Sequence, residues 1–221
     1  MSEGHPEVHV SSARHSATSL LCWLAAGAVA APVCTVVHES GHYLAGWLLD
    51  FPDLEFHGDA VSSSAAQGRY PSGQLGTMAV AGPLATLLLG VLFTVVALRW
   101  PGSLSIGFSL TDLARPLVMG PRYVLRLILQ QGGSSSLGEQ LPRMQAQGLD
   151  NMADETVAAL NLGLPQATFV AGGFVIAAVL AYLVLARTRA LWTIPLLIGL
   201  VLGAGLGLLT YLRLIVPWAI G

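Results

Sequence analysis

The residues best suited to chemistry are His38, Glu39 and His42, which form an HExxH pattern. On a helix, residues four apart lie on one face, so both imidazoles can bind the same zinc ion. Glu39 then lies beside a water on that ion, whose pKa zinc lowers toward about 7. The Glu39 carboxylate can take a proton from this water as a general base. The spacing therefore predicts a hydrolytic zinc site, provided that the segment is helical.

The motif lies inside an apolar run from Leu20 to Leu49. A bilayer needs about 20 such residues, so the run is long enough to cross a membrane as a helix. His38 follows Leu20 by about 27 Å at the helical rise, so we expect the motif near the C-terminal end of this first span. Ionisable groups inside such segments are costly and mark functional sites.

The composition predicts an integral membrane protein. Of the 221 residues, 54% are hydrophobic and only 10% are charged, and the mean hydropathy is +0.67. A soluble domain usually has about 25% charged residues. The net charge of −2 and the absence of a basic stripe argue against nucleic-acid binding. All ten basic residues are Arg, which suggests a GC-rich genome, and we therefore expect a bacterial cell membrane.

The apolar runs predict an all-α integral membrane fold with about five transmembrane helices. A polar tail, 1–19, precedes the first span, and we expect that span to be an uncleaved helix and not a signal peptide, because its apolar character continues past Ala30. Polar loops are expected at 50–74, with a short strand or hairpin near 53–57, and at 130–163, ending in a short helix. The expected spans are residues 20–49, 75–98, 104–129, 167–185 and 191–214.

Small residues share the helix face of the two histidines, which predicts close packing there. Residues three and four apart are neighbours on a helix surface. The second span carries a matching run, Ala81-Gly82-Pro83, followed by Ala85. Small residues let two membrane helices approach closely, so we expect the second span beside the metal site. The small residues on the histidine face are Ala31, Cys34, Gly41 and Ala45.

A catalytic zinc site needs a third protein ligand and one position for water. Asp154 and Asp150 precede the fourth expected span on the side where the first span ends, which is the His42 side. Asp112, in the third expected span, is also within reach, but Arg115 three residues on is expected to pair with it. We therefore place Asp154 first, ahead of Asp112 and Asp150. A site with a Glu ligand would use Glu55 or Glu155.

An HExxH motif in a membrane helix, followed by a Gly-Pro-bearing span and a downstream Asp, resembles the site-2 protease family of intramembrane zinc metalloproteases. The segment Ala81-Gly82-Pro83-Leu84-Ala85-Thr86 is similar to the family's Gly-Pro-x-x-Asn, with Thr86 in place of Asn. The family's Asn-x-x-Pro-x-x-x-x-Asp-Gly stretch, which supplies its third ligand, is not intact. Residues 112–116 and the segment from Asp154 to Pro165 are similar to parts of it. The resemblance covers mainly residues 20–90.

The resemblance implies that residues 20–221 form one metalloprotease-like domain in the lipid bilayer. We expect a zinc endopeptidase with His38, His42 and Asp154 as ligands and Glu39 as base, and Arg115 is a candidate donor to the oxyanion. Its partners would be transmembrane or membrane-associated protein substrates. The alternative is a catalytically silent membrane scaffold that retains the HExxH helix.

Overall fold

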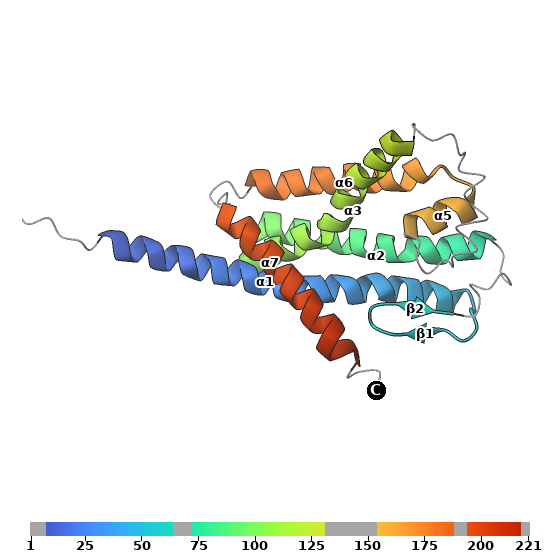
Figure 1. Ribbon diagram of the computed structural model, residues 1–221, viewed down its shortest axis with the longest axis horizontal. Coiled ribbons are helices and arrows are strands. Elements are labelled where there is room, and N and C mark those ends of the chain that lie inside the picture. The colour runs from blue at the N-terminus through green and yellow to red at the C-terminus, as the bar shows by residue number, and fades with distance from the viewer. Residues whose placement is uncertain (1–7, 64–71, 131–153, 188–193, 218–221) are drawn as a thin grey trace, which may run out of the picture.

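The computed structural model describes residues 8–63, 72–130, 154–187 and 194–217, and within these ranges the chain is mostly helical (Figure 1). Helices α1, α2 and α6 run side by side along the long axis of the molecule, and α3 and α7 cross them obliquely. The helices are α1 (Val8–Leu48), α2 (Ser72–Arg99), α3 (Ser103–Gln130), α5 (Asp154–Leu162), α6 (Gln166–Arg187) and α7 (Ile194–Thr210), which continues as the π-helical turn η4 (Tyr211–Ile215).

Among the described residues, four helices are long and apolar enough to cross a membrane. They match four of the five expected spans in position, length and apolar character. The third expected span, 104–129, is helical as α3 but is not one of the four. Its charged residues Asp112, Arg115, Arg122 and Arg126 interrupt the apolar run. The four membrane-length segments are Leu20–Leu48, Gly73–Arg99, Ala167–Arg187 and Leu197–Ile215.

Helix α1 is longer than the sequence predicted. It begins at Val8, so residues 8–19 of the expected polar tail are helical, and its 41 residues extend for roughly 60 Å. Pro32 lies inside the helix without ending it. His38 and His42 fall in its last third, so the expected position of the motif near the C-terminal end of the first span is confirmed.

Five helices meet in one buried apolar cluster. It takes one residue from each of α1, α2, α3, α6 and α7: Trp23, Ala97, Ile106, Val184 and Leu200. A buried hydrogen bond of 2.9 Å between the hydroxyl oxygens of Thr94 and Ser109 also joins α2 to α3. Helix α3 is thus held inside the bundle against α1, α2 and α6. This packing fixes the position of Arg115, which lies on α3.

Glycines allow α7 to lie directly against the backbone of α1. Gly199, Gly203 and Gly207 recur every four residues on α7. A Cβ atom added to Gly203 would overlap the carbonyl oxygen of Leu24, and one added to Gly207 would overlap that of Ala28. Small residues at this spacing let membrane helices pack through van der Waals contact of their backbones.

The loop after α1 forms the expected hairpin, with strand β1 (Glu55–Phe56) antiparallel to β2 (Val61–Ser62). The ring of Phe56 meets the ring of Tyr43 on α1 edge to face, with centroids 5.9 Å apart. Tyr211 donates a hydrogen bond of 2.9 Å to the carbonyl oxygen of Gly58, whose φ of +84° favours glycine. The hairpin is therefore fixed beside the HExxH end of α1.

We predict that Gly203→Leu destabilises the helix bundle by roughly 1–3 kcal/mol, because the added side chain has no space between α7 and α1. Thermal unfolding of the purified protein in detergent measures this loss. Gly205→Leu is the matched control, since a Cβ atom there meets nothing within 4 Å. Equal stability of the two variants would contradict the close backbone contact.

Candidate metal centre

The helix that carries HExxH packs closely against α2, as the small residues predicted. A Cβ atom on Gly41 would lie 2.5 Å from the carbonyl oxygen of Ala81. A Cβ atom on Gly82 would overlap the imidazole of His42, so glycine at position 82 leaves the space that this ring occupies. The Gly-Pro segment of α2 therefore forms the wall behind the histidines.

A backbone carbonyl orients His42. The Nδ1 atom of its ring lies 2.8 Å from the carbonyl oxygen of Met78, which accepts a hydrogen bond from Nδ1–H. In the neutral ring, Nε2 then carries a free lone pair. A carbonyl partner on the other ring nitrogen is the usual arrangement for a metal-binding histidine. Only 7% of the His42 surface is exposed, so this lone pair is directed into the protein.

The ring of His38 directs its Nε2 atom toward Nε2 of His42. Its Nε2 atom lies 3.2 Å from Nε2 of His42, and its Nδ1 atom lies 3.5 Å from the hydroxyl oxygen of Thr86. Thr86 stands where the similar family segment has Asn, and here it is the polar neighbour of the ring. Like His42, His38 is buried, with 4% of its surface exposed.

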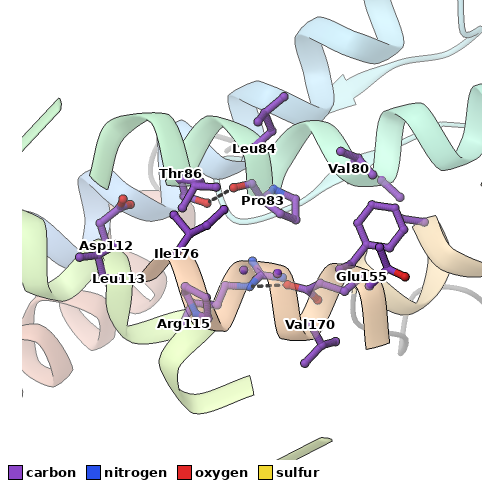
Figure 2. A pocket seen from close by; sticks show the side chains of 18 residues that line it. Val80, Pro83, Leu84, Thr86, Asp112, Leu113, Arg115, Glu155, Val170 and Ile176 are labelled. Carbon is purple, nitrogen blue, oxygen red and sulfur yellow. Dashed lines mark hydrogen bonds and ion pairs between the residues drawn. The ribbon is translucent and has the colours of Figure 1, made fainter. Parts of the chain in front are cut away.

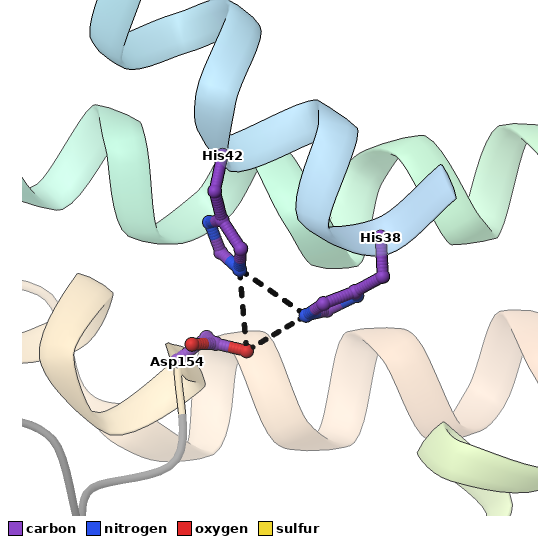
Figure 3. A group of neighbouring side chains, drawn as sticks. All are labelled: His38, His42 and Asp154. Carbon is purple, nitrogen blue, oxygen red and sulfur yellow. Dashed lines mark hydrogen bonds and ion pairs between the residues drawn. The ribbon is translucent and has the colours of Figure 1, made fainter. Parts of the chain in front are cut away.

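Asp154, the first residue of α5, completes the cluster (Figure 3). Its Oδ2 atom lies 3.0 Å from Nε2 of His38 and 3.6 Å from Nε2 of His42. The two histidines are separated from Asp154 by more than 110 residues, and α5 packs against α2. The structure thus places together His38, His42 and Asp154, which could hold a metal ion.

The other acids considered as third ligand do not join this cluster in the described part of the chain. Asp112 is 97% buried on α3, and neither of its carboxylate oxygens has a hydrogen-bond partner there. The expected Asp112–Arg115 ion pair is wrong, because Arg115 turns to α5 instead. Glu55 lies 3.4 Å from His57 in the hairpin. Asp150 lies outside the described residues.

Arg115 makes the contact that sequence reasoning missed. Its guanidinium donates from Nη1 to Nε2 of His38 at 2.6 Å and from Nη2 to Oδ2 of Asp154 at 2.5 Å. These are two of the three atoms that would bind a metal. Its Nε also lies 3.9 Å from a carboxylate oxygen of Glu155. An Arg in an apolar stretch needs a counter-ion, and this requirement was visible in the sequence. Which acid serves as the counter-ion depends on how α3 and α5 pack, and the sequence does not show that packing.

Three electron-rich atoms therefore converge, and they favour a cation between them. Burial raises the pKa of Asp154, but hydrogen bonds with His38 and His42 and the charge of Arg115 outweigh burial, and the net pKa lies well below its ordinary value. The carboxylate is thus charged at neutral pH. A ring N–H can donate to the Asp154 carboxylate, but metal binding requires both imidazoles to present lone pairs instead. Two lone pairs beside a carboxylate repel one another unless a positive charge compensates them. Here the Arg115 guanidinium supplies one, and a metal ion would supply two.

Glu39 lies next to this cluster and is not bound by it. It is partly buried on α1, and its carboxyl group interacts electrostatically with His42, Asp154 and Arg115. Within the residues that the structure describes, no hydrogen bond or ion pair restrains its carboxylate. Glu39 is therefore available to exchange a proton beside the three groups that could hold a metal ion.

Comparison of the chain with protein-family models, with curated proteins and with solved structures found no match. The chemistry assigned to the site therefore depends on its own geometry.

We predict that Asp154→Asn lowers zinc affinity by more than about 100-fold, because losing a metal ligand should cost more than losing a supporting group. Titration of the purified protein against a zinc-chelating dye measures the affinity. Asp112→Asn is the matched control, as it changes a buried acid on α3 that lies outside the cluster, and it should bind zinc like the wild type. Weaker zinc binding by Asp112→Asn, with unchanged binding by Asp154→Asn, would identify Asp112 as the ligand.

We also predict that Arg115→Gln raises zinc affinity by at least about tenfold, or 1.4 kcal/mol, because the metal no longer displaces a guanidinium from His38 and Asp154. The metal-free variant should unfold at a lower temperature, since Asp154 loses its cation. Arg187→Gln, at the exposed end of α6, is the control. Weaker zinc binding by Arg115→Gln would show that Arg115 supports the metal site.

Proposed function

We propose that this protein is an intramembrane zinc metalloprotease that hydrolyses peptide bonds of membrane-spanning or membrane-adjacent proteins. The observation that carries the proposal is a convergence of side chains. His38 and His42, with Glu39 beside them, lie on a helix long and apolar enough for a bilayer, and Asp154 of the short helix α5 meets them there. The resemblance of the HExxH and Gly-Pro segments to the site-2 protease family supports the same reading. We expect the protein to act in a bacterial cell membrane.

The spacing of the three groups suits zinc. Zinc takes nitrogen and oxygen ligands at about 2.0–2.1 Å in a tetrahedron, which separates neighbouring ligand atoms by about 3.3 Å. The three separations here are 3.0, 3.2 and 3.6 Å. Three protein ligands leave the fourth tetrahedral position for water or substrate, which distinguishes catalytic from structural zinc sites.

In this proposal, several residues around the metal centre each have a role in hydrolysis. Zinc, when bound, supplies a Lewis acid that activates water and polarises the substrate carbonyl. Glu39 accepts a proton from the attacking water and returns it to the leaving amine nitrogen. Met78 and Thr86 hold the imidazoles in orientation. Arg115, displaced from His38, remains within reach of the site as a donor to the developing oxyanion.

A second candidate function is a catalytically silent membrane scaffold, and the position of Arg115 favours it. The guanidinium joins α1, α3 and α5 through its contacts with His38 and Asp154. In that case the cluster is a structural ion pair at the end of the bundle. Purified protein with no bound zinc after exposure to a slight excess of the metal would support this alternative over the protease.

We predict that Glu39→Gln retains bound zinc and loses proteolysis by at least about 100-fold, because it removes only the general base. Zinc content is measured by elemental analysis, and cleavage by the release of fluorescent fragments from labelled casein in detergent. Glu55→Gln, in the exposed hairpin, is the matched control and should cleave at the wild-type rate. Equal cleavage by the Glu39 variant would remove this residue from the mechanism.

A further inference from the structure

A cavity of about 270 Å³ lies beside the metal centre, between α2, α3, α5 and α6 (Figure 2). Most of its lining is apolar and includes Pro83 and Leu84 of α2, Leu113 of α3, and Val170 and Ile176 of α6. Apolar cavities of about 150 Å³ already hold benzene. Sites for whole small-molecule ligands are usually larger, at about 300–1,000 Å³. The volume therefore suits one large side chain.

The cavity is continuous with the metal centre through three of its lining residues. Thr86 lies beside His38, Arg115 contacts His38 and Asp154, and Glu155 follows Asp154 on α5. These polar residues are part of the cavity lining, and Figure 2 shows the side chain of Arg115 directed toward Glu155. A group held in the apolar part is thus presented to the three metal-binding residues.

Two adjacent glycines of α6 keep the cavity open. A Cβ atom on Gly172 would meet nothing within 4 Å, and one on Gly173 would meet only Pro116 Cβ, at 3.7 Å, an ordinary contact. The helix therefore gives no packing reason for glycine at either position. Glycine inside a helix costs about 1 kcal/mol relative to alanine. Space for an occupant gives a reason for glycine at these two positions of the lining.

We propose that this cavity is the specificity pocket of the enzyme and binds one large aliphatic or aromatic side chain of the substrate, next to the bond that is cut. The inference rests on the proposed protease function. A helical substrate buries its amides in its own hydrogen bonds, so the segment at the site must be extended, and extension frees a side chain to enter the cavity. Selection then depends on how well the side chain fills the space.

The proposal is tested with small hydroxamates, which bind zinc through one end and carry a chosen group at the other. Acetohydroxamate has only a methyl group, and 3-phenylpropanohydroxamate has a phenyl group that the cavity should accept. Their affinities for the zinc-loaded protein in detergent are measured by calorimetry. We expect the phenyl compound to bind at least about tenfold more tightly, since hydrophobic pockets discriminate even single methylenes by about that factor.

Gly173→Leu should fill the cavity without displacing the backbone and reduce this preference to less than about threefold, with acetohydroxamate affinity unchanged. Gly205→Leu makes the same substitution in open space on α7 and should keep the preference. An equal preference in wild type and Gly173→Leu overturns the pocket, because it shows that the phenyl group binds elsewhere or partitions into detergent. If acetohydroxamate binds none of the zinc-treated proteins, the chain has no zinc site. That result would contradict both the proposed protease function and the pocket.

Discussion

The structure around the site depends on one electrostatic constraint, which is that two imidazole nitrogens and a carboxylate oxygen meet within 3.6 Å of one another in a buried place. The carbonyl oxygen of Met78 fixes the tautomer of His42, so the lone pair of Nε2 is turned inward. Such a group is stabilised by ring N–H donors to the carboxylate, or by a cation in its centre or at its edge. The Arg115 guanidinium fills that role in the metal-free arrangement, and a divalent metal would fill it more strongly.

This constraint gives a physical reason for the way the helices pack. Gly41 brings α1 against the backbone of α2, and Gly82 leaves space for the ring of His42. The histidines thus lie against the face of α2 that holds Met78 and Thr86. Helix α5 then brings Asp154 to the cluster. Because α6 presents glycines to α3, a cavity remains next to the metal-binding atoms. Small residues therefore have two roles: those of α1 and α2 allow the helices to meet at the site, and the glycines of α6 leave space beside it.

Much of the site could be predicted from the sequence because it depends on local spacing. Two histidines four residues apart must share a helix face, and the small residues on that face predicted the contact with Ala81 and Gly82. The order of the apolar segments also placed Asp154 near His42. Long-range side-chain pairing could not be predicted in this way. Arg115 was expected to pair with Asp112, three residues away, but the packing of α3 against α5 gave it Asp154 instead. The third expected span failed for a different reason, since charged residues such as Asp112 and Arg115 interrupt the apolar run of α3.

The central claim is that His38, His42 and Asp154 bind one zinc ion, and X-ray absorption spectroscopy of the zinc-loaded protein tests it most directly. The account predicts four nitrogen or oxygen neighbours at about 2.0–2.1 Å, with the outer-shell scattering of two imidazoles. Six oxygen neighbours without imidazole scattering would contradict it. So would a sulfur neighbour at about 2.3 Å, which would point to Cys34, the buried cysteine one turn before His38.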